Sequence, residues 1–408
     1  MASLGPHLPR GRTDLEVLYV HPATSREDYH IPMGVLSLIN SLRCRKRGVM
    51  SWELTPGLIR GTRVAALDLH WYFPLALVEK IASVLKKANP KIQVVVGGST
   101  ATIFARQIIE RFPVDYVVLG DADRPFRELV DALLAGMPVT RVANIASAAG
   151  RSGSTYAAAQ GDADYDQMDP ISCDWFPTFQ ERMRRVQREH PGEFREDLGV
   201  YPFVPVVRGC RHECTGCYAH PDVHRRLFAR GMAVRSPEAV VDTLLRCERD
   251  PDVATVHMIG DFLDLLPEAY ADLILGRKYN LHLTYDLYNV PGLERIEAFR
   301  RCFRSVSFTC HMYCDHGKTR SAEHEARLFG LLAHLRAKEC HAALFADFRE
   351  VDLKALRAKL ASLPNVSLMD NSHWYIPVPY PGTDEEVARQ FEHFYALCCG
   401  QRGSGGAT

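Results

Sequence analysis

The amino-acid sequence predicts an α/β protein built from two parallel-sheet units in series. Short β-branched runs alternate with helical patterns in two separate stretches, which is typical of parallel sheets with helical crossovers. A small, polar stretch with little pattern at 150–161 separates the two series. The chain has 408 residues, 47% of them hydrophobic, which is enough for two cores.

The first series predicts a Rossmann-like parallel sheet. We expect strands at 15–20, 64–69, 92–96 and 115–119, with helices at 32–43, 75–87 and 105–111 between them. The glycines that follow the third and fourth strands are typical strand ends. In such sheets, ligand-facing loops lie at the carboxyl ends of the strands.

The second series predicts an open, partial (β/α)6 TIM-like barrel. One helix, at 237–247, begins with the serine cap and first-turn proline of Ser236–Pro237. We therefore divide the chain into a Rossmann-like domain (1–148), a linker (149–199), the partial barrel (200–362) and a C-terminal extension (363–408) whose tail we expect to be disordered. The expected strands lie at 204–207, 254–259, 281–285, 305–309, 341–345 and 365–369.

Charge and composition exclude several classes of protein. Lys+Arg and Asp+Glu balance at 49 each, which argues against a nucleic-acid or membrane-surface binder. The N-terminus does not resemble a signal peptide, and no apolar run reaches the length of a membrane span. We therefore expect a cytoplasmic protein, in which the 12 cysteines are reduced thiols or metal ligands.

Three cysteines on one short loop, in the segment RGCRHECTGCYAH, are the strongest chemical signal. Cys210, Cys214 and Cys217 directly follow an expected strand. Three thiolates can hold three corners of a 4Fe–4S cluster and leave one iron open to a substrate. The alternative is a zinc site in which His220 is the fourth ligand.

The CxxxCxxC loop after a first barrel strand resembles the signature of the radical S-adenosylmethionine enzymes. The resemblance implies that the open iron binds S-adenosylmethionine, which a reduced cluster cleaves at a C–S bond. It also implies a small-molecule substrate and an external electron donor of the flavodoxin or ferredoxin type. The segment MIGD resembles the Gly-Gly-Glu element of the family, so Gly260 and Asp261 are implied to hold the cofactor, with Asp261 also a candidate catalytic residue. Tyr218, Tyr288 and Asn289 are further implied cofactor contacts.

The first unit resembles the cobalamin-binding-type domain that precedes the barrel in one radical subgroup. Matching pieces are IPMGVLSL, DLHWYFP, VVVGGSTAT and VDYVVLGDADRPFREL. The resemblance implies that a corrin nucleotide tail lies near the strand ends. The Asp-x-His-x-x-Gly axial motif is absent, so a cobalamin-free scaffold remains an alternative. The implied contacts are Gly97, Gly98, Ser99 and Thr100, with His70 and Gly120 beside them.

Four further cysteines bear on which group of S-adenosylmethionine is transferred, and they leave this question open. Cys310 and Cys314 would face the site from a strand end if the barrel prediction holds and could then meet a substrate, but we favour buried thiols without a role. Cys398 and Cys399 form a vicinal pair that could bind a thiophilic species.

The expected reaction is transfer of a methyl or other alkyl group from S-adenosylmethionine. The alternative is 3-amino-3-carboxypropyl transfer to arsenite, and a third is a corrinoid- or metal-carrying protein without catalysis. Arg225, Arg226, Arg230 and Arg235 follow the cysteine loop, and we expect them to form a solvated basic face.

Overall fold

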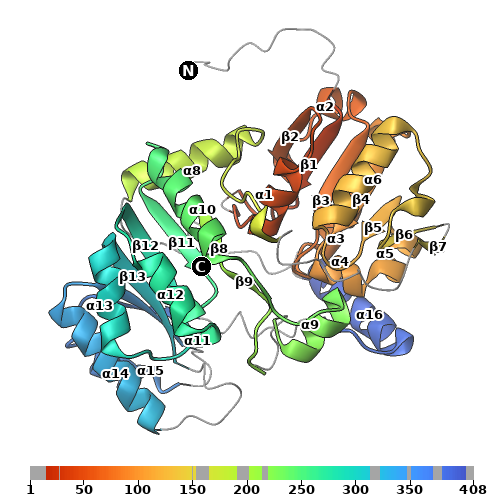
Figure 1. Ribbon diagram of the computed structural model, residues 1–408. Coiled ribbons are helices and arrows are strands. Elements are labelled where there is room, and N and C mark those ends of the chain that lie inside the picture. The colour runs from red at the N-terminus through yellow and green to blue at the C-terminus, as the bar shows by residue number, and fades with distance from the viewer. Residues whose placement is uncertain are drawn as a thin grey trace, which may run out of the picture.

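Two sheets lie side by side in the computed structural model, with α9 (Pro221–Phe228) between them and below (Figure 1). The structure describes residues 15–26, 28–148, 150–152, 165–190, 202–213, 219–312, 322–346, 351–370 and 379–400. Cys214, Cys217, Tyr218, Cys314 and the tail beyond residue 400 lie outside these ranges, so their predicted roles are not tested by it.

The first sheet has seven strands in the order β2-β1-β3-β4-β5-β6-β7, of which the first five are parallel. The chain order reverses between β1 and β3, which makes their carboxyl ends the switch point where ligands bind in open α/β sheets. The strands are β1 (Val17–His21), β2 (Lys46–Met50), β3 (Val64–Asp68), β4 (Gln93–Gly97), β5 (Tyr116–Val118), β6 (Ile145–Ser147) and β7 (Gly150–Ser152).

Helices cover both faces of this sheet, as the Rossmann-like prediction requires. Apolar side chains of α3, α4 and α5 form the core on one face, and those of α1, α6 and α8 form the core on the other. These helices are α1 (Met33–Asn40), α2 (Pro56–Arg60), α3 (Leu75–Ala88), α4 (Ser99–Ile103), α5 (Ala105–Arg111), α6 (Asp123–Ala135) and α8 (Pro177–Glu189).

The four predicted strands of this unit are present, but three others escaped prediction. β2 begins with Lys46-Arg47-Gly48, a polar start that hides its pattern, and Gly48 is required because a Cβ there would lie 2.5 Å from the Phe176 ring. β7 occupies the start of the stretch that we predicted as an unstructured linker, and α8 lies later in the predicted linker region at 149–199. Residues 150–152 form a strand instead of a linker because they pair with β6 in antiparallel orientation.

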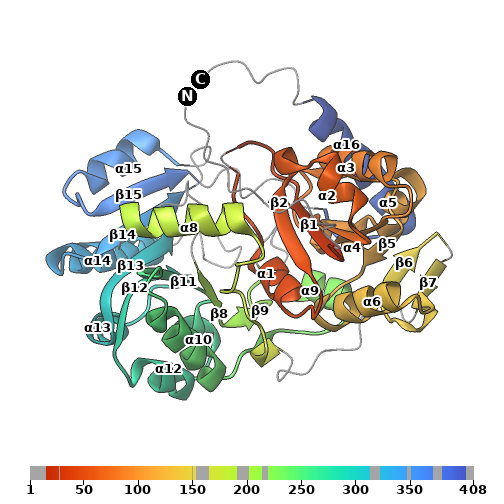
Figure 2. The ribbon, with the colours of Figure 1, turned by 90° about the horizontal axis from the view of Figure 1, so that it is seen from above.

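The second sheet has six parallel strands in the order β15-β14-β13-β12-β11-β8 (Figure 2). All six strands match predicted ones, and their sequential order is that of a partial (β/α)6 barrel. β15 pairs with β14, so the sheet runs past residue 362. The strands are β8 (Phe203–Pro205), β11 (Thr255–Ile259), β12 (Tyr279–Leu287), β13 (Phe303–His311), β14 (His341–Ala346) and β15 (Val366–Asp370).

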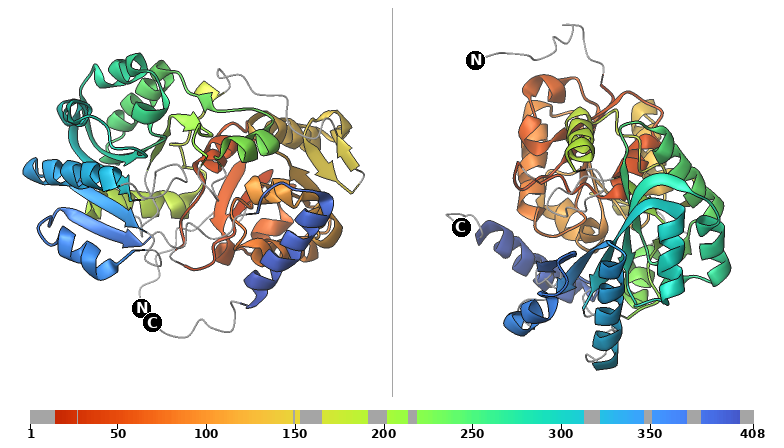
Figure 3. Two further views of the ribbon diagram at one scale, coloured as in Figure 1. Left: turned by 90° about the horizontal axis from the view of Figure 1, so that it is seen from below. Right: turned by 90° about the vertical axis from the view of Figure 1, so that its left-hand side faces the viewer.

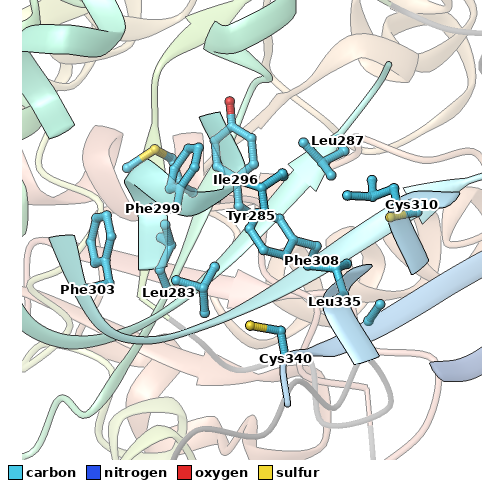
Figure 4. Packing of buried hydrophobic residues seen from close by; sticks show 14 of the residues in the cluster. Leu283, Tyr285, Leu287, Ile296, Phe299, Phe303, Phe308, Cys310, Leu335 and Cys340 are labelled. Carbon is cyan, nitrogen blue, oxygen red and sulfur yellow. The ribbon is translucent and has the colours of Figure 1, made fainter. Parts of the chain in front are cut away.

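Alternation along these strands separates an apolar layer from a polar one. Leu283, Tyr285 and Leu287 of β12 pack with Phe299 and Phe308 beneath the outer helices (Figure 4). Because successive side chains of a strand point to opposite faces, the residues between them face the inside of the partial barrel. The outer helices are α10 (Pro237–Arg249), α12 (Glu268–Leu275), α13 (Leu293–Cys302), α14 (Ala322–Ala337) and α15 (Leu353–Leu360).

The last helix, α16 (Asp384–Gly400), returns to the first sheet (Figure 3). Phe391 and Phe394 are buried in the core of that sheet, and the Tyr395 hydroxyl donates to Glu79 on α3. This packing places the end of the chain against its beginning rather than against the barrel. No helix among the described residues is long and apolar enough to cross a membrane.

Candidate functional site

The cysteine loop begins directly after the first barrel strand. β8 leads through β9 (Val207–Arg208) and Gly209 to Cys210, whose amide donates to the Ala219 carbonyl at 3.1 Å and so closes the base of the loop. Gly209 has φ +84°, and a Cβ there would lie 3.0 Å from the His224 ring. The backbone thus turns tightly between the strand and α9, which gives the loop a fixed start and end.

His220 has a structural role that the zinc alternative did not anticipate. Its Nδ1 accepts a hydrogen bond from the Asp222 amide at 3.1 Å and caps the first turn of α9. A ring nitrogen that satisfies a helix terminus accounts for this histidine without a metal. His220 is thus engaged at the start of α9, and the assignment of Cys210, Cys214 and Cys217 to a cluster stays a prediction.

Buried ion pairs connect the cysteine loop to the first sheet. Arg208 Nη1 lies 2.7 Å from Asp121 Oδ1 and 2.7 Å from Asp123 Oδ2, just beyond the end of β5. Arg230 Nη2 lies 2.6 Å from the other Asp121 oxygen. Burial alone would raise the pKa of Asp123, but the charge of Arg208 outweighs it and the pKa is lowered. The two sheets therefore present their carboxyl ends to the same loop.

The predicted cofactor contacts of the first sheet gather at one edge. Gly97 ends β4, Gly98 has φ +115°, and Ser99 begins α4. A Cβ at Gly98 would lie 2.7 Å from the Leu69 carbonyl, beside His70. Thr100 Oγ1 donates to the His70 carbonyl at 3.0 Å. The loop after β4, which contains Gly97 and Gly98, and the segment Leu69–His70 after β3 are therefore in direct contact.

Gly120, at the end of β5, approaches α9 rather than open space. Its φ is +65°, and a Cβ there would lie 2.9 Å from the Leu227 carbonyl. Its amide donates to Thr102 Oγ1 at 3.0 Å. At β5, the carboxyl-end edge of the first sheet is therefore covered by α9, the helix that follows the cysteine loop.

A buried acid–base cluster occupies the switch point. The Tyr19 hydroxyl donates to Asp68 Oδ1, which also lies 3.2 Å from His21 Nδ1. His21 Nε2 is buried without a hydrogen-bond partner, and the nearest carboxylate oxygen, on Asp28, is 4.0 Å away. Burial would lower the pKa of His21, but Asp68 and Asp28 raise it to about 9. An orphaned buried nitrogen at a switch point fits a ligand there.

Asp261 and Gly260 lie at the end of β11, as predicted. Asp261 is 1% exposed and accepts from the Tyr285 hydroxyl at 2.8 Å, the Tyr288 amide at 2.7 Å and the Asp264 amide at 3.2 Å. Burial raises its pKa to about 6. This carboxylate caps α11 (Phe262–Leu265) and fixes the turn after β12. These three hydrogen bonds fix the position of its carboxylate, and the predicted contact with a cofactor stays a prediction.

Asp264 is a site residue that the sequence analysis missed. It accepts from Asn289 Nδ2 at 2.8 Å, and its other oxygen contacts His212 in the cysteine loop. Arg211 also reaches its backbone carbonyl. Asp264 thus joins the cysteine loop to the ends of β11 and β12. The sequence signal that could have identified Asp264 is its position three residues after Asp261, which places both carboxylates on the same side of one helical turn.

The additional cysteines that the structure describes do not converge. Cys310 is 1% exposed and packs in the apolar layer with Leu287 (Figure 4), which agrees with the favoured interpretation of a buried thiol and not with a thiol that faces the inside of the barrel. Burial raises its thiol pKa to about 12. Cys398 donates to the Tyr72 carbonyl at 3.3 Å on the first sheet, and Cys399 is exposed. The alternation of side chains along β13 explains this position, because Thr309 and His311 face inward and Cys310 between them faces outward.

The expected basic face is also wrong for two arginines. The Arg230 side chain is 8% exposed and Arg235 is 2% exposed. Arg235 donates to Thr243 Oγ1 at 2.9 Å and approaches the Met168 carbonyl, while burial lowers its pKa. These two side chains are held by partners inside the protein instead of meeting solvent.

Solved structures with the same arrangement are radical enzymes that carry two cofactors. TsrM from Kitasatospora setae, a radical S-adenosylmethionine methyltransferase with cobalamin and a 4Fe–4S cluster bound, matches with a TM-score of 0.58 and 15% identity. The match covers 86% of this chain and 74% of TsrM. A TsrM structure with tryptophan substrate and a S-adenosylmethionine analogue matches at 0.55 and 16%, over 81% of this chain and 67% of that one.

OxsB, a cobalamin-dependent S-adenosylmethionine radical enzyme with aqua-cobalamin and S-adenosylmethionine bound, matches with a TM-score of 0.56 and 13% identity over 93% of this chain. This chain spans 55% of the length of OxsB. No protein-family model and no curated protein sequence matches the chain. The seven-stranded Rossmann-like sheet, the six-stranded partial barrel and their order along the chain are thus the fold of the cobalamin-dependent radical S-adenosylmethionine enzymes.

Proposed function

We propose that this protein is a radical S-adenosylmethionine enzyme that transfers a methyl or other alkyl group to a small-molecule substrate. The observation that carries the proposal is the position of Cys210. It opens a three-cysteine loop at the carboxyl end of the first strand of a partial barrel, which is where barrel enzymes place their active sites. The same loop is ion-paired to the ligand-binding edge of a Rossmann-like sheet.

Cys210, Cys214 and Cys217 would hold a 4Fe–4S cluster through their thiolates. The cluster, when bound, supplies the electron that breaks a C–S bond of S-adenosylmethionine. The chain itself keeps the loop in place: Asp264 joins His212 to Asn289, and Gly260 lets β11 pass close to β9. Electrons would come from a flavodoxin- or ferredoxin-type donor, in a reducing cytoplasm that keeps these thiols free.

Cobalamin would bind at the edge formed by Gly97, Gly98, Ser99 and His70. The unpartnered His21 Nε2 at the switch point supports a ligand there. When bound, cobalamin supplies a carrier for the methyl group. A cobalamin-free scaffold is the alternative. Transfer of a 3-amino-3-carboxypropyl group to arsenite stays the alternative reaction, and it rests on the vicinal pair Cys398 and Cys399.

Product analysis after anaerobic reconstitution tests the proposal. The protein is supplied with iron, sulfide, hydroxocobalamin, reductant and S-adenosylmethionine, and the nucleoside products are separated. We expect a brown, iron-loaded protein that releases 5′-deoxyadenosine or, for methyl transfer, S-adenosylhomocysteine. Methylthioadenosine would identify aminocarboxypropyl transfer instead. A colourless protein that binds zinc but no iron would overturn the proposal.

A further inference from the structure

The inward face of the six-stranded sheet is unusually polar. Most inward positions of its described strands carry histidines, serines and threonines, and none carries lysine, arginine or glutamate. The apolar residues at these positions are Phe203, Pro205, Ile259, Ala343, Phe345 and Met369. The polar side chains are Thr255 and His257, His282, Thr284 and Asp286, Ser305, Ser307, Thr309 and His311, His341, and Ser367. Asp286 is the single carboxylate among these inward positions, and it lies near the carboxyl end of β12.

Asp286 is fixed through one of its two oxygens. His257 Nε2 lies 2.9 Å from Oδ1, and the Thr309 hydroxyl donates to the same oxygen. No described residue donates to Oδ2, and the side chain is 18% exposed. Burial alone would raise the pKa of Asp286, but the charge and hydrogen bond of His257 lower it, so the carboxylate stays ionised. Two strands thus orient a charged group whose second oxygen has capacity for a further donor.

Thr284 provides a second unsatisfied group on the same face of β12. The residue is 0% exposed and its hydroxyl has no hydrogen-bond partner. A buried polar group without a partner costs about 1–3 kcal/mol, so such groups are rare unless a ligand or water completes them. Because Thr284 and Asp286 are two residues apart, their side chains lie on one face. His282, by contrast, is satisfied by Ser305 and Ser307.

We propose that Asp286 and Thr284 form the substrate subsite, and that it takes the ammonium group of an organic amine. The ammonium donates to Asp286 Oδ2, and Thr284 Oγ1 completes the contact. His257 is a positioning residue, because it acts through Asp286. The proposal rests on the proposed function in one respect: the molecule that carries this ammonium group is the substrate that accepts the alkyl group, at an atom other than the bound nitrogen. A cation suits this face because its inward positions carry a carboxylate and no lysine or arginine.

Ligand-observed NMR with two probes of the same shape tests the subsite directly. Benzylammonium carries the proposed charge, and benzyl alcohol does not. We expect benzylammonium to bind the full-length protein and to lose about tenfold in affinity, about 1.4 kcal/mol, in Asp286→Asn. Asp272→Asn is the matched control, since Asp272 is an exposed carboxylate on α12. Benzyl alcohol should bind the wild type and Asp286→Asn equally.

Three outcomes overturn the proposal. The first is no benzylammonium binding to the wild type, and the second is unchanged binding in Asp286→Asn. The third concerns S-adenosylmethionine, which also carries an amine. In cluster-loaded protein, S-adenosylmethionine should change the electron paramagnetic resonance spectrum of the reduced cluster equally in wild type and Asp286→Asn. Loss of that change in the variant would assign Asp286 to the cofactor.

Two variants of His257 test whether this residue positions Asp286. The benzylammonium experiment also distinguishes failure of the amine subsite from failure of the proposed radical function. His257→Gln keeps a donor for Asp286 and should retain benzylammonium binding, whereas His257→Ala should weaken it severalfold. Equal binding in both variants would contradict the positioning role. Amine binding does not require the cluster. A protein that binds benzylammonium through Asp286 but never acquires iron would therefore refute the proposed function alone.

Discussion

Arg208, two residues before the first cysteine of the loop, forms a 2.7 Å ion pair with Asp121 beyond the end of β5. Asp121 is only 2% exposed, and its second oxygen is taken by Arg230, from the segment that follows α9. One carboxylate of the first sheet thus holds both sides of the cysteine loop. This contact sets the position of the loop relative to the edge where a second cofactor would bind.

Replacement of Asp121 by asparagine should therefore cost much more than the loss of an average ion pair. Arg230 would remain buried without its counter-charge, while Arg208 would keep only its pair with Asp123. Breaking a buried pair typically costs about 3–5 kcal/mol. We expect the free energy of unfolding, measured by urea denaturation, to fall by about 3 kcal/mol. The control is Glu110→Gln, which removes an exposed pair with Arg106 and should change it by less than about 1 kcal/mol. Equal losses would contradict the role of Asp121.

Gly260 should tolerate no side chain. Its φ is +99°, and a Cβ would lie 2.6 Å from Val207 Cγ2 and 3.1 Å from the Val207 nitrogen. Gly260→Ala should lower the free energy of unfolding by about 1–3 kcal/mol and displace β9. Gly34 in α1 has no neighbour within 4 Å, so Gly34→Ala should stabilise by about 0.5–1 kcal/mol. Thermal or urea unfolding of both variants checks the opposite signs.

The strands of both sheets could be predicted because their patterns are strong. Continuous apolar runs such as Val94–Val96 mark parallel strands that are buried on both faces. β2 and β7 could not be predicted, because a charged start and a glycine–serine composition hide strands at the ends of a sheet, where pairing partners rather than propensity decide. The cysteine loop was found from spacing alone, since its ligands are adjacent in sequence.

The contacts around the cysteine loop could not be predicted from the sequence for a different reason. Arg230, Arg235 and Asp264 are charged residues that resemble surface positions in sequence, and their partners come from distant segments. The sequence left two positions open for Cys310, because the direction of each side chain on β13 depends on register, which a one-residue shift inverts. Asp286 and Thr284 were missed for the same reason, as their role follows from which face of β12 they occupy.

Cluster loading should depend on the loop cysteines and not on the buried one. Cys210→Ala and Cys214→Ala should each abolish stable iron and sulfide incorporation, because two thiolates do not hold three corners of a cubane. Cys310→Ala should keep wild-type iron content, since this thiol lies in the apolar layer of the barrel. Iron and sulfide assays with visible absorption measure the difference. Normal loading in Cys214→Ala would refute the assignment.

His21 should make the stability of the fold decrease as the pH rises from neutral to alkaline. Its pKa in the folded protein is raised from 6.5 to about 9: burial would lower it, but the carboxylates of Asp68 and Asp28 outweigh that cost. A group whose pKa is raised on folding stabilises the folded state when protonated. The contribution is therefore complete below about pH 6.5 and is lost as the pH passes 9, with a size on the order of 2–3 kcal/mol.

Urea unfolding between pH 6.5 and 9.5 measures this contribution, with His21→Gln as the variant that cannot protonate. The wild type should be more stable than His21→Gln at pH 6.5, and the difference should shrink as the pH rises, because the wild type alone releases the proton that its carboxylates hold. His30→Gln is the matched control, since it removes an imidazole beside the same Asp28 from a side chain that is 56% exposed. A difference that is constant across this range would mean that His21 is neutral in the folded protein, and that the buried cluster at the switch point carries the negative charge of its carboxylates instead.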